Sequence, residues 1–196
     1  CTGRLHLLPL IHPMPKFLKW LLIILAALFV IGFFGFRYMK TQTKKASPEE
    51  VVTFHVGDLS LEVDYSRPSK KGRAIFGGLV PYGKVWRTGA NEATTVTINK
   101  DMRFGNTAVK AGKYTLWSIP GADEWSVILN SKMYGWGVNF DGEAQRDPLA
   151  DVAEVKVPVR HILVPMEQFT IAVEGNPAEL TLTWDDVQVG VPVATQ

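Results

Sequence analysis

The densest group of side chains able to do chemistry lies in the segment WRTGANE, residues 86–92. Arg87 and Glu92 stand five residues apart across a glycine turn, a spacing that allows a charge-assisted pair, and the Asn91 amide can satisfy nearby backbone groups. Two interpretations stay open. The segment is either a small-ligand site, with Arg87 holding an anion and Glu92 acting as acceptor or base, or an internal polar network that pins a loop.

Two further features point to ligands. Four cations fall within seven residues, from Arg67 to Arg73; such a run binds phosphate, sulfate or lipid headgroups, or forms a solvated loop. Trp136 lies in a glycine-containing stretch and could stack on a sugar, whereas tryptophans at strand positions are expected in the core. The candidate ligand-binding residues are Arg67, Arg73, Trp86, Arg87, Asn91, Glu92 and Trp136.

Recognised catalytic motifs are missing from the sequence. It has no Gly-x-Ser-x-Gly, no phosphate-binding loop that ends in Lys-Ser/Thr and no His-Glu-x-x-His. Between residues 51 and 193 the only histidines are His55 and His161, which are far apart, and the only cysteine of the chain is Cys1. We therefore expect neither a metal nor a cofactor.

The elements that must position these residues are β-strands. Apolar residues, mostly β-branched or aromatic, alternate with polar ones, as in half-buried antiparallel strands, and turn residues separate the runs. This pattern predicts an all-β, antiparallel β-sandwich of jelly-roll-like form. Residues 66–91 and 132–151 read as long loops, where binding usually occurs. The expected strands include 52–56, 61–65, 96–98, 114–116, 127–129, 155–159, 169–173 and 180–184.

One apolar segment precedes this domain. Residues 20–36 carry no charge, and at about 1.5 Å per residue they span roughly 26 Å as a helix. The absence of a polar face disfavours a buried core helix. A cleaved signal peptide is the closer alternative, but bulky phenylalanines end the segment and no small-residue cleavage site follows closely. We predict an uncleaved signal anchor that crosses the membrane over residues 17–38.

Charge divides the chain in the same way. Residues 1–45 hold seven cations and no acidic residue, so the rest holds 14 Lys and Arg against 19 Asp and Glu, a net charge of −5. An acidic domain has the wrong sign for nucleic acid. The basic linker, residues 39–50, could favour anionic lipid or serve as a plain stalk.

The N-terminal end carries two further expectations. Residues 1–16 form an N-terminal extension before the anchor. Met14 begins a typical anchor sequence, so we expect it to be the natural initiator and residues 1–13 to be an upstream extension or a fragment edge; alternatively, Cys1 is a processed, lipid-bearing end. The flanking cations lean slightly towards a cytoplasmic C-terminal domain by the positive-inside rule.

The block 75–94, IFGGLVPYGKVWRTGANEAT, carries a family resemblance, together with YSRP at 65–68 and WSVILN at 125–130. Over about residues 66–183 the chain resembles an uncharacterised bacterial envelope family known only as a domain of unknown function. The resemblance implies a secreted or membrane-anchored β-sandwich, periplasmic or on the cell surface, and brings no activity with it.

Together these features predict a β-sandwich domain, residues 51–193, held outside the cytoplasm by the anchor. Its expected role is to bind a small anionic or sugar ligand or to serve as an accessory of an envelope protein complex. A purely structural envelope subunit is a further possibility. The alternative is a hydrolase-like or isomerase-like enzyme that uses Glu92 with Arg87 and Asn91.

Overall fold

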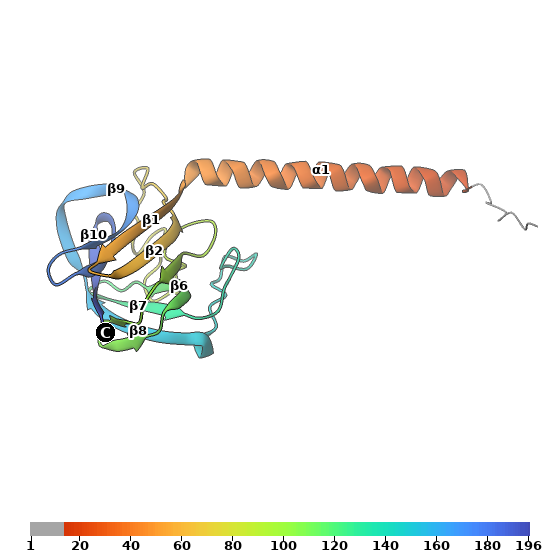
Figure 1. Ribbon diagram of the computed structural model, residues 1–196. Coiled ribbons are helices and arrows are strands. Elements are labelled where there is room, and N and C mark those ends of the chain that lie inside the picture. Colours follow the sequence, from red (N-terminus) through yellow and green to blue (C-terminus); the bar gives the residue numbers. More distant parts are fainter. Residues whose placement is uncertain (1–13) are drawn as a thin grey trace, which may run out of the picture. The chain divides into compact units, whose positions relative to one another are not determined.

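The computed structural model describes residues 14–196 (Figure 1). The expectations about Cys1 and the first thirteen residues of the N-terminal extension lie outside the described residues. The chain divides into two compact units, Cys1–Gln42 and Thr43–Gln196.

The N-terminal unit contains most of helix α1, Lys16–Ala46. None of the 31 residues of α1 is buried, and the helix is long and apolar enough to cross a membrane. The apolar stretch of α1 packs against no other part of the described chain, which fits a membrane anchor or a signal sequence better than a core helix. The helix continues past residue 38, so the predicted basic linker is helical as far as Ala46. The last turn of the helix, from Thr43, belongs to the second unit.

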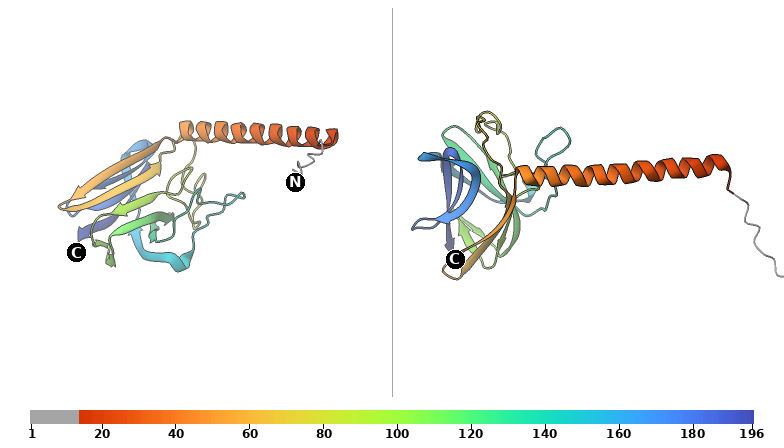
Figure 2. Two further views of the ribbon diagram at one scale, coloured as in Figure 1. Left: turned by 45° about the vertical axis from the view of Figure 1, so that its right-hand side comes forward. Right: turned by 90° about the horizontal axis from the view of Figure 1, so that it is seen from above.

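The second unit consists of two antiparallel sheets, which confirms the predicted all-β fold. The six-stranded sheet has the order β1-β2-β3-β6-β7-β8, and the four-stranded sheet has the order β5-β4-β10-β9 (Figures 1 and 2). The strands are β1 Glu49–Val56, β2 Leu59–Ser66, β3 Thr95–Ile98, β4 Met102–Phe104, β5 Thr107–Val109, β6 Gly112–Ile119, β7 Glu124–Asn130, β8 Asp151–Pro158, β9 Arg160–Glu174 and β10 Glu179–Thr195.

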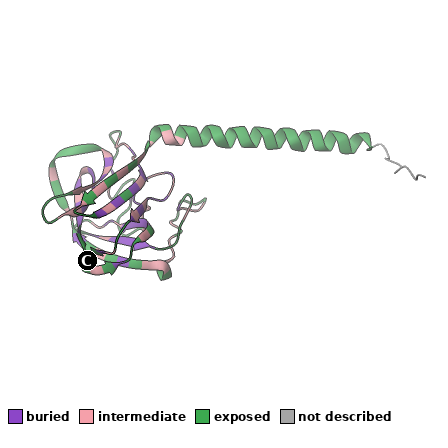
Figure 3. Cartoon of the chain, viewed as in Figure 1, coloured by how far each residue is buried: buried purple, intermediate pink, exposed green. Residues whose placement is uncertain are grey.

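The core lies between the sheets because alternate side chains of both face inwards. Figure 3 shows the buried residues along the strands. Leu61 and Val63 of β2 are fully buried, and so are Val189 and Val191 of β10. Five buried or half-buried aromatic rings close one end of this core, with centroid distances of 4.7 to 6.3 Å between neighbours. They are Phe76, Trp86, Trp125, Phe169 and Trp184.

Two short strands were not expected from the sequence. β4 and β5 have three residues each and form a hairpin around Gly105. Three residues show too little alternation to be recognised, and only the turn residues around them carry a signal. Both segments that the sequence predicts to be long loops are irregular in the structure. The first long loop, residues 67–94, links β2 to β3, and the second long loop, residues 131–147, follows β7.

Candidate functional site

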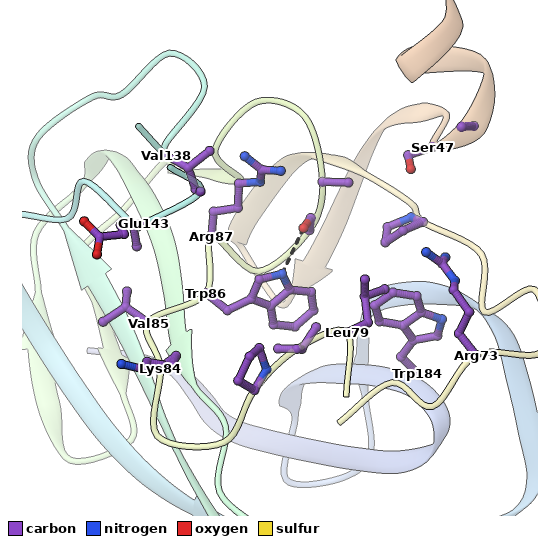
Figure 4. A pocket seen from close by; sticks show the side chains of 18 of the residues that line it. Ser47, Arg73, Leu79, Lys84, Val85, Trp86, Arg87, Val138, Glu143 and Trp184 are labelled. Atoms are coloured by element: carbon purple, nitrogen blue, oxygen red, sulfur yellow. Dashed lines mark hydrogen bonds between the residues drawn. The ribbon is translucent and has the colours of Figure 1, made fainter. Parts of the chain in front are cut away.

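A cleft of about 860 Å³ opens between the two long loops (Figure 4). The first long loop supplies most of its lining, the second supplies residues between Val138 and Ala144, and Trp184 of β10 closes one side. Ala46 and Ser47, at the end of α1, complete the lining. The cleft therefore gathers residues that lie up to 138 positions apart in the sequence.

Close packing shapes the first long loop. The amide of Val80 donates to the carbonyl oxygen of Ile75 at 2.9 Å, and the amide of Gly77 donates to that of Val80 at 2.9 Å. Gly77 has φ +79°, and a Cβ there would come within 2.8 Å of the Tyr82 ring. The glycines of the GGLVP segment thus allow a tight turn, and glycine is the residue that tolerates this backbone geometry.

Backbone pairing fixes the position of Trp86. Its amide donates to the carbonyl oxygen of Ser118 at 2.7 Å, and the amide of Ser118 donates back at 2.9 Å. Because Ser118 belongs to β6, inside the six-stranded sheet, this bridge holds the middle of the loop against a rigid element. The side chain of Trp86 is consequently placed by the sheet rather than by the loop alone.

The floor of the cleft is apolar and aromatic. The rings of Trp86 and Trp184 are stacked at 6.1 Å with an interplanar angle of 18°, and Leu79 lies beside them (Figure 4). Both indole N–H groups are satisfied, by Gly89 O at 3.0 Å and Glu167 O at 3.2 Å. The floor therefore presents carbon atoms and ring surface rather than hydrogen-bond donors to a ligand.

Cations surround this floor. Lys71, Arg73, Lys84 and Arg87 line the cleft, whereas its acidic residues are Asp141 and Glu143 of the second long loop. Figure 4 shows Arg73 and Arg87 on two sides of the tryptophan pair. Four positive charges against two negative ones give the lining a net positive charge, which favours an anionic ligand.

Arg87 is the most informative of these cations. It is half-buried, and its Nη1 donates to the carbonyl oxygen of Trp136 at 3.0 Å. Among residues 14–196 no carboxylate oxygen lies within 4.0 Å of its guanidinium nitrogens. Burial lowers the pKa of Arg87, and the more distant Glu92 only partly opposes this effect. A desolvated guanidinium with spare donors is a suitable partner for an anion.

Arg73 and Arg67 differ in their roles. Arg73 lines the cleft and donates to the carbonyl oxygens of Lys70 and Ser69 at 3.0 and 2.6 Å, which orients its guanidinium. Arg67 is not among the lining residues. It pairs with Glu50 of β1 at 2.8 Å and donates to two oxygens of β9, so it links the edges of the two sheets.

Asn91 and Glu92 also lie outside the cleft lining. The Asn91 Nδ2 group donates to Ser47 O at 3.1 Å, and Glu92 Oε1 lies 3.7 Å from Lys44 Nζ. Glu92 lines a second cavity of about 170 Å³. The sequence analysis placed Arg87, Asn91 and Glu92 in one candidate site. The structure instead places Asn91 and Glu92 outside the cleft that Arg87 lines.

The second cavity is acidic. It is lined by the carboxylates of Glu49, Asp64 and Glu92 together with Lys113. Burial, reinforced by the charge of Glu49, raises the pKa of Asp64 above its usual value. In residues 14–196 no group of three or more His, Cys, Asp or Glu side chains has a metal-binding arrangement.

Of the seven predicted site residues, the cleft brings together Arg73, Trp86 and Arg87. Trp136 is 39% exposed and touches the site through its carbonyl group, which accepts from Arg87. Sequence reasoning missed Leu79, Lys84 and Trp184. The first two stand in the quoted block 75–94, but Trp184 follows about 100 residues later and no sequence signal joins it to Trp86.

Comparison with known proteins supports one assignment. No curated protein and no solved structure matches the chain significantly. A family model described as "Protein of unknown function (DUF2911)" matches residues 47–193, which cover both sheets and both long loops. The chain therefore belongs to the DUF2911 family of proteins of unknown function.

Proposed function

We propose that this protein is a membrane-anchored binding protein whose cleft takes a small anion with an apolar or aromatic body. The observation that carries the proposal is the half-buried Arg87, which has no carboxylate partner among the described residues and lies beside the stacked Trp86 and Trp184. Arg87 would pair with the anionic group, and the half-buried Trp86, stacked on the buried Trp184, would contact the apolar part.

The dimensions of the cleft support this class of ligand. A volume of about 860 Å³ falls within the roughly 300–1,000 Å³ of small-molecule sites. Such sites combine a mostly apolar lining with a few charged groups that orient the ligand. Here Leu79 and the tryptophans supply the apolar lining, and Arg73 and Arg87 supply the charged groups.

The geometry favours binding over catalysis by Arg87, Asn91 and Glu92. The amide of Asn91 is occupied by Ser47 and the carboxylate of Glu92 lies next to Lys44, so neither side chain faces the cleft with Arg87. A general base must reach the proton that it abstracts. The carboxylates nearest to a bound ligand would instead be Asp141 and Glu143.

The proposal includes a location outside the cytoplasm. An apolar α1 supports membrane attachment, and the envelope-like signature at residues 75–94 supports the outer side. We expect alkaline phosphatase fused after Gln196 to be active in a bacterial host and green fluorescent protein at the same position to be dark. An active fluorescent fusion with an inactive phosphatase fusion would place the domain in the cytoplasm and overturn this part.

Ligand binding can be measured on residues 37–196. Among residues 14–196, all buried core residues lie between Leu59 and Val193, and no residue of α1 is buried, so this fragment keeps the described core and the end of the helix. Cooperative thermal unfolding of the fragment is the check that it is folded.

The probe is 8-anilinonaphthalene-1-sulfonate (ANS), an anion with an aromatic body. Its matched control, N-phenyl-1-naphthylamine, has nearly the same rings without the sulfonate. We expect saturable binding of one ANS per chain, roughly tenfold tighter than binding of the neutral amine, because the sulfonate pairs with Arg87. Equal affinities, or no saturable ANS binding, would contradict the proposal.

A further inference from the structure

The end of α1 is fastened to the β-domain at the corner formed by Asn91 and Glu92. We call residues 43–47 the latch segment; it belongs to the same compact unit as the sheets. Its helical turn is closed by the amide of Ser47, which donates to the carbonyl oxygen of Thr43 at 3.0 Å. The carbonyl groups that a helix leaves open at its C-terminus need partners from elsewhere.

Asn91 supplies such a partner. Its Nδ2 lies 3.1 Å from Ser47 O, 3.5 Å from Thr43 O and 3.4 Å from Ser66 Oγ. The residue is only 6% exposed and has φ +57°, a left-handed conformation that asparagine tolerates better than most residues. The side-chain amide of Asn91 thus holds the latch segment.

Lys44 adds an electrostatic contact. Its Nζ forms an ion pair with Glu49 and lies 3.7 Å from Glu92 Oε1, at the acidic cavity that Asp64 also lines. The hydrogen bond to Glu49 raises the pKa of Lys44. Charged hydrogen bonds of this kind are the stronger ones, although partial exposure weakens them.

The same short stretch of loop also forms part of the ligand cleft. Gly89 and Ala90 line the cleft just before the Asn91–Glu92 corner, and Ala46 and Ser47 of the latch segment line it as well. A latch segment released from the corner would therefore remove Ala46 and Ser47 from the lining of the cleft.

We propose that the latch segment is a releasable wall of the ligand cleft, so that closing of the latch and ligand binding stabilise each other. The inference rests on the proposed function, because it concerns the regulation of that site. Thermodynamic linkage makes the effect reciprocal. If closing of the latch tightens ligand binding by some factor, ligand binding favours the closed latch by the same factor.

The first test concerns the latch alone. Replacing Lys44 by methionine keeps the aliphatic stem but removes the ion pairs, whereas Lys45→Met changes an exposed neighbour. In the full chain in phosphatidylcholine nanodiscs, hydrogen exchange of peptides covering residues 43–48 should be roughly threefold faster for Lys44→Met than for Lys45→Met. Equal rates would overturn the latch and leave the proposed ligand site intact.

The second test concerns the coupling. With ANS at ten times its dissociation constant, the fragment 37–196 should exchange at the Ser47 amide about elevenfold more slowly if only the closed latch binds. The amide of Gly105, bonded to Pro192 O on another part of the domain, should be unaffected. Saturable ANS binding without slower exchange at Ser47 would overturn the coupling alone, whereas a lack of ANS binding would overturn both proposals.

Discussion

Replacing Trp184 by alanine should lower the free energy of unfolding of the β-domain by about 3–5 kcal/mol. Trp184 is 1% exposed and packs against three aromatic rings, with centroid distances of 6.0 to 6.3 Å to Phe76, Trp86 and Phe169. Its removal leaves a cavity that the surrounding sheets cannot fill, and the carbonyl oxygen of Glu167 loses one of its two donors, while the amide of Lys70 still donates to it. Urea unfolding of residues 37–196 measures the loss.

Trp136→Ala is the matched control. The same side chain is removed, but Trp136 is 39% exposed on the second long loop, and the bond from Arg87 reaches its backbone carbonyl. We expect a change within about 0.5 kcal/mol, as for most surface substitutions. Equal losses for the two variants would mean that the aromatic cluster does not hold the two sheets together at this end.

The second large effect is expected on ligand binding. Arg87→Gln should weaken ANS binding roughly 10- to 100-fold, since a charged hydrogen bond in a partly buried site contributes about 1.5–3 kcal/mol. Lysine at this position keeps the charge but loses the planar fork of donors. The ANS affinity of Arg87→Lys should therefore lie between that of the unchanged protein and that of Arg87→Gln. Fluorescence titration of residues 37–196 measures all three affinities.

Two controls separate charge pairing from a disturbed loop. N-phenyl-1-naphthylamine lacks the sulfonate, so Arg87→Gln should leave its affinity unchanged. Arg103→Gln removes an exposed arginine on β4, away from the cleft lining, and should leave ANS binding unchanged. If Arg87→Gln weakened both ligands equally, the side chain would act by holding Trp136 and its loop in place rather than by pairing with the anion.

Sequence patterns were sufficient for the main part of the fold. In β2 the alternating burial from Leu59 to Tyr65 follows the alternation of apolar and polar residues. An uninterrupted apolar run likewise predicted α1, because a helix on the surface of a soluble domain needs a polar face towards solvent and this helix has none. The local signal failed where a strand was too short to show a period, as in β4 and β5. It also missed the first part of β9 and the second part of β10, where the register shifts around Asp185 interrupt the pairing of the two strands.

The candidate site was less accessible to sequence reasoning. Spacing placed Arg87, Asn91 and Glu92 in one loop, but it could not show that the chain turns between Gly89 and Asn91, so that the arginine faces the cleft and the other two face the latch segment. Trp184 of β10 meets Trp86 of the first long loop through a ring contact between residues distant in the sequence, which no local pattern encodes.

The most direct test of the proposed site is an NMR titration of the arginine Nε–Hε signals of ¹⁵N-labelled residues 37–196 with naphthalene-1-sulfonate. We expect the Arg87 signal, assigned through its loss in Arg87→Gln, to move saturably while the Arg103 signal stays in place. An unmoved Arg87 signal, with the ligand bound elsewhere or not at all, would show that Arg87 is not the anion-binding residue.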